Sequence, residues 1–164
     1  MFEQPVKIRK FRAADLETLH RIDLDCFSED IAFSRTELEF YLNHPQSIAR
    51  VAEGVGRILG FVLARIESPF HAHILTLDIV PEARRCRIGT SLMEELHGRL
   101  RKRGIGAAVL EVAAKNIPAR HLYEKMNYRY LGTLSGYYYG REDAFRMAYL
   151  FSKQETASEG KVKE

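Results

Sequence analysis

The sequence predicts an α/β protein with a mixed, mostly antiparallel sheet of about six to seven strands and helices on both faces. Runs typical of strands alternate along the chain with runs of helical periodicity, which favours this class. Two strand-like runs flank a tight turn at Gly54-Val55-Gly56, a pattern typical of an antiparallel hairpin. The run AAVLEVAA at 107–114 is apolar on both faces apart from Glu111, as expected of a central strand covered on both sides.

The N-terminal elements follow from local patterns. Residues 5–11 alternate apolar and basic side chains, which predicts a half-buried first strand. Leucine and isoleucine at helical spacing predict a helix over 13–26. Ser34 and Glu37 have the spacing of a capping box, and Pro45 limits the helix that they begin.

Three strands and a long helix are predicted next. The strands cover 47–53, 57–68 and 71–80, the first two being joined by the hairpin. Residues 89–103 carry leucines four positions apart on one face, and Gly104 is placed to end this helix.

The C-terminal part is predicted to contain one more helix and two strands. Asn116 caps a short helix that has Pro118 in its first turn. Closing strands are expected near 128–134 and 144–151. The polar, aperiodic residues 152–164 are predicted to be a disordered tail, so the folded domain is expected to be 1–151.

Composition narrows the function classes. The chain has 164 residues, 46% of them hydrophobic, and a formal charge of +3, too small an excess to indicate a nucleic-acid partner. A secretory signal and an apolar run long enough to span a bilayer are both missing, so we expect a soluble cytoplasmic protein without a membrane partner. Cys26 and Cys86 are expected to be reduced thiols.

The stretch ARRCRIGTSL at 83–92 predicts an anion site. It joins a strand to a helix whose first N–H groups lack intrahelical partners, and the helix dipole adds positive potential there. Arg84, Arg85 and Arg87 offer donors suited to phosphate. The alternative is a solvated basic turn. Neither a P-loop nor a dinucleotide-binding glycine pattern is present.

Two longer stretches resemble the GNAT acetyltransferases. VPEARRCRIGTSLM resembles that family's pyrophosphate-binding motif Q/R-x-x-G-x-G/A, with Arg84 first and Gly89 last. LEVAAKNIPARHLYEKMNY resembles the block L-E-V-x-x-x-N-x-x-A-x-x-L-Y-x-x-x-G-F, in the family's order and spacing. The ending YYYGREDAFRMAY is similar to the RimI-type acetyltransferases, which modify the N-termini of ribosomal proteins.

This resemblance implies the GNAT fold and acetyl-CoA as the ligand. It implies transfer of the acetyl group to the N-terminal α-amine of a protein, for example a ribosomal protein, by direct attack in a ternary complex. A small amine or a lysine side chain as acceptor, and a non-catalytic acetyl-CoA-binding module, are the alternatives. The resemblance implies a cofactor site formed by Ile79, Val80, Arg84, Arg85, Arg87, Ile88, Gly89, Thr90, Asn116 and Tyr123.

Within that set, backbone N–H groups near Ile79 and Val80 are expected to polarise the thioester carbonyl. Two positions depart from the family pattern. Arg87 occupies the first glycine of the motif, where a side chain either binds phosphate or weakens the cofactor. Asn127 replaces a later glycine, and asparagine tolerates the left-handed conformation.

Glu111 and Tyr123 are the predicted catalytic residues. Glu111 interrupts an apolar strand, so we expect burial to raise its pKa toward a value useful for a general base. The alternative is a carboxylate bonded to neighbouring backbone. Periodicity alone makes Tyr123 a core aromatic, whereas the resemblance implies that it protonates the departing thiolate.

The acceptor is expected to meet aromatic side chains in loops. These are Phe27, Phe33, Tyr137, Tyr138 and Tyr139; for the tyrosines the alternative is an aromatic-rich strand. His71 and His73 flank a single alanine, too few ligands to predict a zinc site, so no metal is expected.

Overall fold

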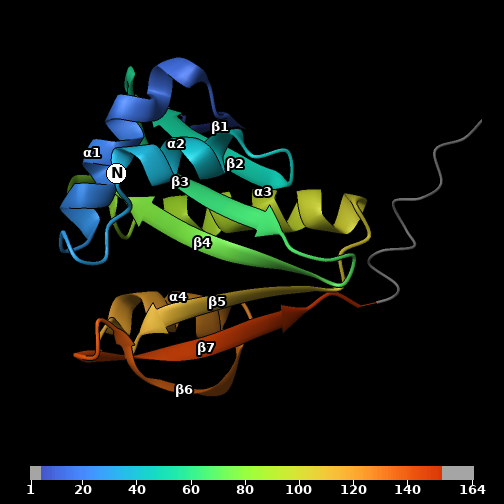
Figure 1. The fold of residues 1–164 in the computed structure, drawn as a ribbon. Coiled ribbons are helices and arrows are strands. Elements are labelled where there is room, and N and C mark those ends of the chain that lie inside the picture. The colour runs from blue at the N-terminus through green and yellow to red at the C-terminus, as the bar shows by residue number, and fades with distance from the viewer. Residues whose placement is uncertain (1–4, 153–164) are drawn as a thin grey trace, which may run out of the picture. The chain divides into compact units, whose positions relative to one another are not determined.

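The computed structural model describes residues 5–152, in which helices and strands alternate as predicted (Figure 1). The strands are β1 (Lys7–Lys10), β2 (Ser47–Gly54), β3 (Arg57–Ile66), β4 (His71–Ile79), β5 (Ala107–Ala113), β6 (Arg129–Tyr138) and β7 (Glu142–Leu150). The α-helices are α1 (Leu16–Cys26), α2 (Arg35–Asn43), α3 (Ile88–Lys102) and α4 (Ile117–Lys125), and short 3₁₀ helices cover Ala13–Asp15 and Pro81–Ala83.

The strands of the described part are hydrogen-bonded in the order β1-β2-β3-β4-β5-β7-β6. The pairs β1–β2, β2–β3, β5–β7 and β6–β7 are antiparallel, whereas β4 and β5 are parallel. The predicted mixed, mostly antiparallel sheet is therefore confirmed. None of the helices within residues 5–152 has both the length and the apolar character needed to cross a membrane.

The chain forms two compact units, and the division falls inside β4 and α3. The first unit contains the residues up to Arg65 together with Leu75–Leu96. The second contains Ile66–Ile74 and the residues from His97 onward. The predicted domain limits of 1–151 stay a prediction. Apart from Ser152, the predicted tail lies outside the described residues.

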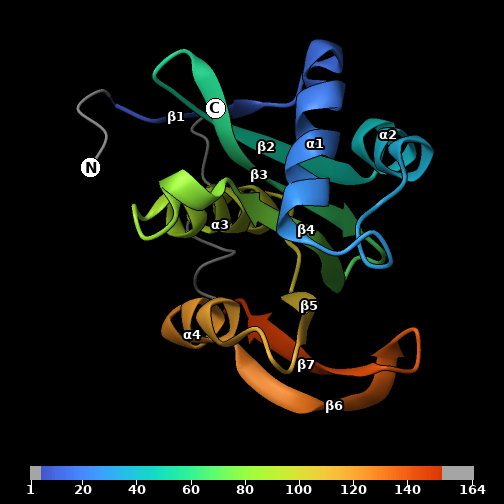
Figure 2. The same cartoon turned by 90° about the vertical axis from the view of Figure 1, so that its left-hand side faces the viewer.

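In the first unit, both faces of β2 are covered. Side chains of α1 and α2 pack on one face of β2 and β3, and α1 is seen crossing these strands in Figure 2. This core contains Leu16, Leu19, Ile22, Leu38, Leu42, Ala49, Val51, Phe61 and Leu63. On the opposite face, Arg50 of β2 forms an ion pair with Glu95 of α3 at 3.4 Å. The apolar stripe predicted for α3 is buried at Leu92 and Leu96.

Local patterns begin and end these elements as predicted. Ser34 and Glu37 form the capping box that begins α2. Val55 and Gly56 both have positive φ, as a two-residue hairpin turn requires. Gly60 of β3 is fixed by a close approach, because a Cβ there would lie 2.5 Å from the carbonyl oxygen of Asp78.

The second unit is built on β5, β6 and β7, with α4 beside them (Figures 1 and 2). Arg120 of α4 lies over the ring of Phe145 in β7 at 4.5 Å, which places α4 on this face. The amide of Phe151, just after β7, donates to the carbonyl oxygen of Gly106 at 2.9 Å.

Two predictions about the second unit are wrong in detail. Burial alternates along β5, so that Leu110 and Val112 are buried while Glu111 lies on a half-buried face. The strand is central but is not covered equally on both sides. The strand expected near 128–134 continues to Tyr138, because its pairing with β7 resumes at Glu142 after a register shift.

Candidate active site

The predicted anion site forms an exposed turn that leads into α3. Its N–H groups at Gly89 and Thr90 belong to the first helical turn and therefore have no intrahelical acceptor. The backbone of Arg85 and Arg87 is left-handed, with φ of 61° and 63°. Arg87 thus adopts the conformation that glycine favours, despite its Cβ. A turn with two exposed guanidinium groups beside a helix N-terminus fits a diphosphate.

Arg84 differs from the other two arginines of the turn. Its Nε donates to the carbonyl oxygen of Ile79 at 3.2 Å, and its Nη2 lies 3.7 Å from Sγ of Cys26. The thiol of Cys26 lies 3.5 Å from the same carbonyl oxygen. Arg84 is therefore anchored to the end of β4, while Ile88 is buried at the start of α3.

One of the expected carbonyl-polarising groups is already engaged. The Val80 N–H donates to the carbonyl oxygen of Leu59 at 2.9 Å, so in this structure it is not available to a thioester. The predicted role of Val80 needs correction for this reason, whereas that of Ile79 stays a prediction.

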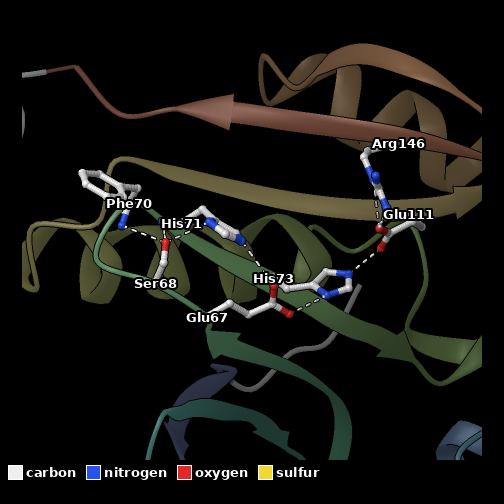
Figure 3. Close-up of polar contacts among 7 residues, drawn as sticks. All are labelled: Glu67, Ser68, Phe70, His71, His73, Glu111 and Arg146. Carbon is white, nitrogen blue, oxygen red and sulfur yellow. Dashed lines mark hydrogen bonds and ion pairs between the residues drawn. The ribbon is translucent and has the colours of Figure 1, made fainter.

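In the second unit, Glu111 lies between two cationic or ionisable partners (Figure 3). Its side chain is 7% exposed, Oε1 accepts from Nε and Nη2 of Arg146 at 3.2 and 3.0 Å, and Oε2 contacts Nε2 of His73. Burial, the largest single influence, acts to raise the pKa of Glu111. The hydrogen bonds and charges of His73 and Arg146 together outweigh it, so the pKa lies below its ordinary value.

The predicted net rise of the Glu111 pKa is therefore wrong in direction, although burial by itself acts as predicted. The sequence showed the apolar neighbours of Glu111 along its own strand, but not the side chains that reach it from β4 and β7. The alternative of a carboxylate bonded to neighbouring backbone is not what the described contacts show, because the partners of Glu111 are side chains.

The contact between His73 and Glu111 was not predicted from the sequence. Its Nδ1 lies 3.1 Å from Oε1 of Glu67, so carboxylates face both ring nitrogens. The hydrogen bond to Glu111 is the largest cause of a pKa raised above the ordinary histidine value, and burial opposes it. The signal lay in strand register: His73 pairs with Val109, which places Glu111 two residues further along the same face of the parallel neighbour.

The other residues predicted near the chemistry lie on or before α4. Asn116 caps that helix as predicted, its Oδ1 accepting from the amide of Ala119 at 3.3 Å, while its contact with the cofactor stays a prediction. Tyr123 is buried, with its ring centroid 5.7 Å from that of Tyr128. It is thus a core aromatic, and its role as a proton donor stays a prediction.

The aromatic residues predicted to bind the acceptor fall into two groups. Tyr137 and Tyr138 lie at the end of β6 rather than in a loop, and Tyr139 lies in the following turn with φ of 53°. Burial raises the pKa of Tyr137 and, to about 12, that of Tyr138, and the charge of Glu111 adds to both shifts. These two tyrosines are therefore close enough to Glu111 to experience its field.

Phe27 and Phe33 lie in the segment between α1 and α2, as predicted. The Phe33 amide donates to Oδ2 of Asp23 at 2.6 Å, and its ring packs edge-on against Tyr41. Within residues 5–152, no three side chains of histidine, cysteine, aspartate or glutamate are placed to hold a metal ion.

Comparisons with known proteins identify relatives over most of the chain. Residues 16–128 match the model of the acetyltransferase (GNAT) family. An uncharacterized N-acetyltransferase of Methanocaldococcus jannaschii is 33% identical over 141 residues, which cover 85% of this chain and 88% of that protein. The N-terminal acetyltransferase B complex catalytic subunit of Arabidopsis thaliana is 30% identical over 153 residues, which cover 89% of this chain and 86% of that subunit.

The fold is also that of a solved enzyme. The crystal structure of the ribosomal-protein-S18-alanine N-acetyltransferase from Escherichia coli superposes with a TM-score of 0.82 at 24% identity, covering 90% of this chain and 95% of that one. Other structural neighbours were solved with acetyl-CoA or coenzyme A bound.

Proposed function

We propose, from the premise that this chain belongs to the GNAT acetyltransferase family, that it acetylates the N-terminal α-amine of a protein. The chain is an N-acetyltransferase that uses acetyl-CoA. The likeness to a catalytic subunit of an N-terminal acetyltransferase complex supports a protein N-terminus as the acceptor. The finer proposal of a ribosomal-protein N-terminus draws on the fold shared with the Escherichia coli enzyme named for that substrate.

The observation that carries this proposal is the pairing of His73 with Glu111. An α-ammonium group titrates near ~7.8 and a lysine side chain near ~10.4. The hydrogen bond to Glu111 raises the pKa of His73 above the ordinary histidine value. A base of this kind removes a proton from an α-ammonium group more readily than from a lysine.

The protein residues have separate tasks in this proposal. Acetyl-CoA supplies the acetyl group as a reactive thioester. Arg85, Arg87 and the first N–H groups of α3 hold its pyrophosphate, while Arg84 braces the turn against Ile79. Asn116 contacts the pantetheine arm.

Glu111 and His73 act together as the base. When an ammonium group becomes an amide, its nitrogen loses two protons, of which one ends on the thiol and the other in solvent. The pair takes these protons from the amine. Tyr123 gives its own proton to the departing sulfur and regains one of the two, while the other leaves to solvent. The amine attacks directly while both substrates are bound, and Tyr137 and Tyr138 contact the acceptor.

A panel of acceptors tests the proposal. Purified protein and acetyl-CoA are mixed with one of three sets of acceptors, and thiol release is followed. The acceptors are peptides that differ in their first residues, the same peptides blocked at the N-terminus but carrying lysine, and small polyamines. Turnover of free N-termini alone is expected. Turnover of only lysine or small amines would contradict the N-terminal proposal, and acetyl-CoA binding without any thiol release would favour a non-catalytic module.

Replacement of Tyr123 by phenylalanine tests the proposed acid. We expect kcat to fall more than about ten-fold, because the departing thiolate loses its proton donor, with little change in acetyl-CoA affinity. A wild-type rate in this variant would remove Tyr123 from the chemistry.

A further inference from the structure

The cluster around His73 continues beyond Glu111 into the loop between β3 and β4. Glu67 follows the end of β3 and reaches two histidines of β4 (Figure 3). Its Oε1 lies 3.1 Å from Nδ1 of His73, and its Oε2 lies 3.2 Å from Nε2 of His71. One carboxylate therefore bridges two side chains that share a face of the strand.

The position of Glu67 is itself fixed by a second set of bonds. The Ser68 hydroxyl accepts from the amides of Phe70 and His71 at 3.1 and 3.2 Å, which leaves its proton to donate. It lies 2.9 Å from Nδ1 of His71, so that nitrogen accepts. His71 then carries its proton on Nε2 and donates it to Glu67.

The same accounting fixes the His73 ring. A carboxylate accepts hydrogen bonds only, so the contact with Glu67 requires a proton on Nδ1 of His73. The other nitrogen, Nε2, is left facing Glu111, and one proton lies between these two groups. Without Glu67, only the contact through Nε2 would remain of these two, and the ring could turn about it.

The exposed fractions of the side chains place Glu111 innermost in the cluster and Glu67 outermost. The exposed fraction of the side chain rises from 7% at Glu111 to 24% at His73 and 30% at Glu67. Other groups that act electrostatically on this cluster include Arg146 of β7 and the phenols Tyr137 and Tyr138 of β6. Arg146 bonds to the Glu111 oxygen that does not face His73, so Glu67 is the carboxylate on the outer side of the ring.

We propose that Glu67 is a positioning residue of this enzyme: it holds the Nδ1 proton of His73 and thereby aims Nε2 at Glu111. The expected effect of Glu67 on catalysis rests on the function proposed above. The arrangement is that of a base oriented by a third group, as recurs wherever an imidazole must present one defined nitrogen.

Replacement of Glu67 by glutamine tests this proposal, with Glu39→Gln as the matched control. Glu39 forms an exposed ion pair with Arg35 on α2, so its loss removes the same charge elsewhere in the chain. The first measurement follows the His73 ring protons by NMR across pH. In Glu67→Gln the His73 titration is expected to move to lower pH, because an anionic partner at Nδ1 is lost, whereas Glu39→Gln leaves it unchanged.

The second measurement is the pH profile of kcat/KM with a peptide acceptor. In Glu67→Gln the acidic limb is expected to move to lower pH and the plateau of kcat to fall about ten-fold, with the KM for acetyl-CoA unchanged. The variant Glu67→Asp, which keeps a carboxylate, is expected to recover part of the rate.

The outcomes separate this proposal from the proposed function. An unshifted His73 titration in Glu67→Gln overturns the positioning role, whatever the activity. A shifted titration with an unaltered kcat plateau also overturns it, because the ring would then not need Glu67 for turnover. If the wild-type protein acetylates no N-terminus while the His73 titration shifts, the proposed function fails and the link between Glu67 and His73 stands.

Discussion

Each unit of the molecule buries a carboxyl group beside another titratable group, but the pKa values of these two carboxyl groups are shifted in opposite directions. In the first unit, burial and the charge of Asp23 raise the pKa of Asp78 well above its ordinary value. In the second, Glu111 is also buried, yet its pKa is lowered by His73 and Arg146. Burial alone therefore does not decide the charge of a carboxylate; its partners do.

The geometry of the first pair explains its behaviour. Oδ1 of Asp23 and Oδ2 of Asp78 are buried without a partner in the described part of the chain, while Thr76 donates to the other oxygen of Asp78. A proton shared between these two side chains gives both orphaned oxygens a partner. Glu111 instead keeps its charge because two partners stabilise the anion.

The largest expected effect comes from removing the charge of Glu111. In Glu111→Gln, kcat with a peptide acceptor should fall about a hundred-fold, because the pair with His73 loses its anionic member. Acetyl-CoA affinity, measured by calorimetry, should stay within about two-fold of wild type, as in Glu39→Gln. A rate within three-fold of wild type (roughly 0.7 kcal/mol of barrier) would show that this carboxylate is structural.

The next effect concerns stability and has opposite signs in the two units. A carboxyl group whose pKa is raised by folding stabilises the folded state at pH values below its pKa in the unfolded chain, which is 3.8 for Asp78. This contribution is lost as pH rises through the pKa of the folded state. Asp78→Asn mimics the protonated form. It should therefore become more stable relative to wild type as pH rises above 3.8.

Urea unfolding of Asp78→Asn and Glu111→Gln at several pH values measures this contrast. Because the folded pKa of Glu111 is lowered, its contribution is present above the unfolded value of 4.5 and disappears as pH falls through the folded pKa. Glu111→Gln should thus be less stable than wild type at neutral pH and approach it in acid. Parallel curves for the two variants would remove the distinction between the pairs.

The smallest effect is expected at an exposed charge. Arg87→Gly restores the motif's glycine and removes left-handed strain of about 1 kcal/mol, which the greater freedom of glycine in the unfolded chain largely offsets. Acetyl-CoA affinity should fall about three- to five-fold, because an exposed ion pair contributes little. Calorimetry at two salt concentrations checks this, and tighter binding in the variant would show that Arg87 hinders the cofactor.

Sequence patterns predicted the elements whose causes are local. The capping box of Ser34 and Glu37, the hairpin turn at Val55 and Gly56, and the left-handed Asn127 all depend on residues within a few positions. The location of Glu111 on a central strand was predictable for the same reason. Its partners were not, because they depend on the register of β4 with β5 and of β5 with β7.

The end of β6 shows the same limit. A run of three tyrosines has the composition of either a strand or a binding loop, and only its pairing with β7 decides between them. The hydrogen bond of the Val80 amide could not be predicted from the sequence either, because its acceptor, the Leu59 carbonyl oxygen, lies on another strand.

Gly60 carries a consequence for the mutational tolerance of this protein. Since even one methyl group at this position would collide with the main chain of β4, a saturation library should return almost no functional substitutions there. Only glycine fits at this position, although the residues that strands ordinarily favour are larger.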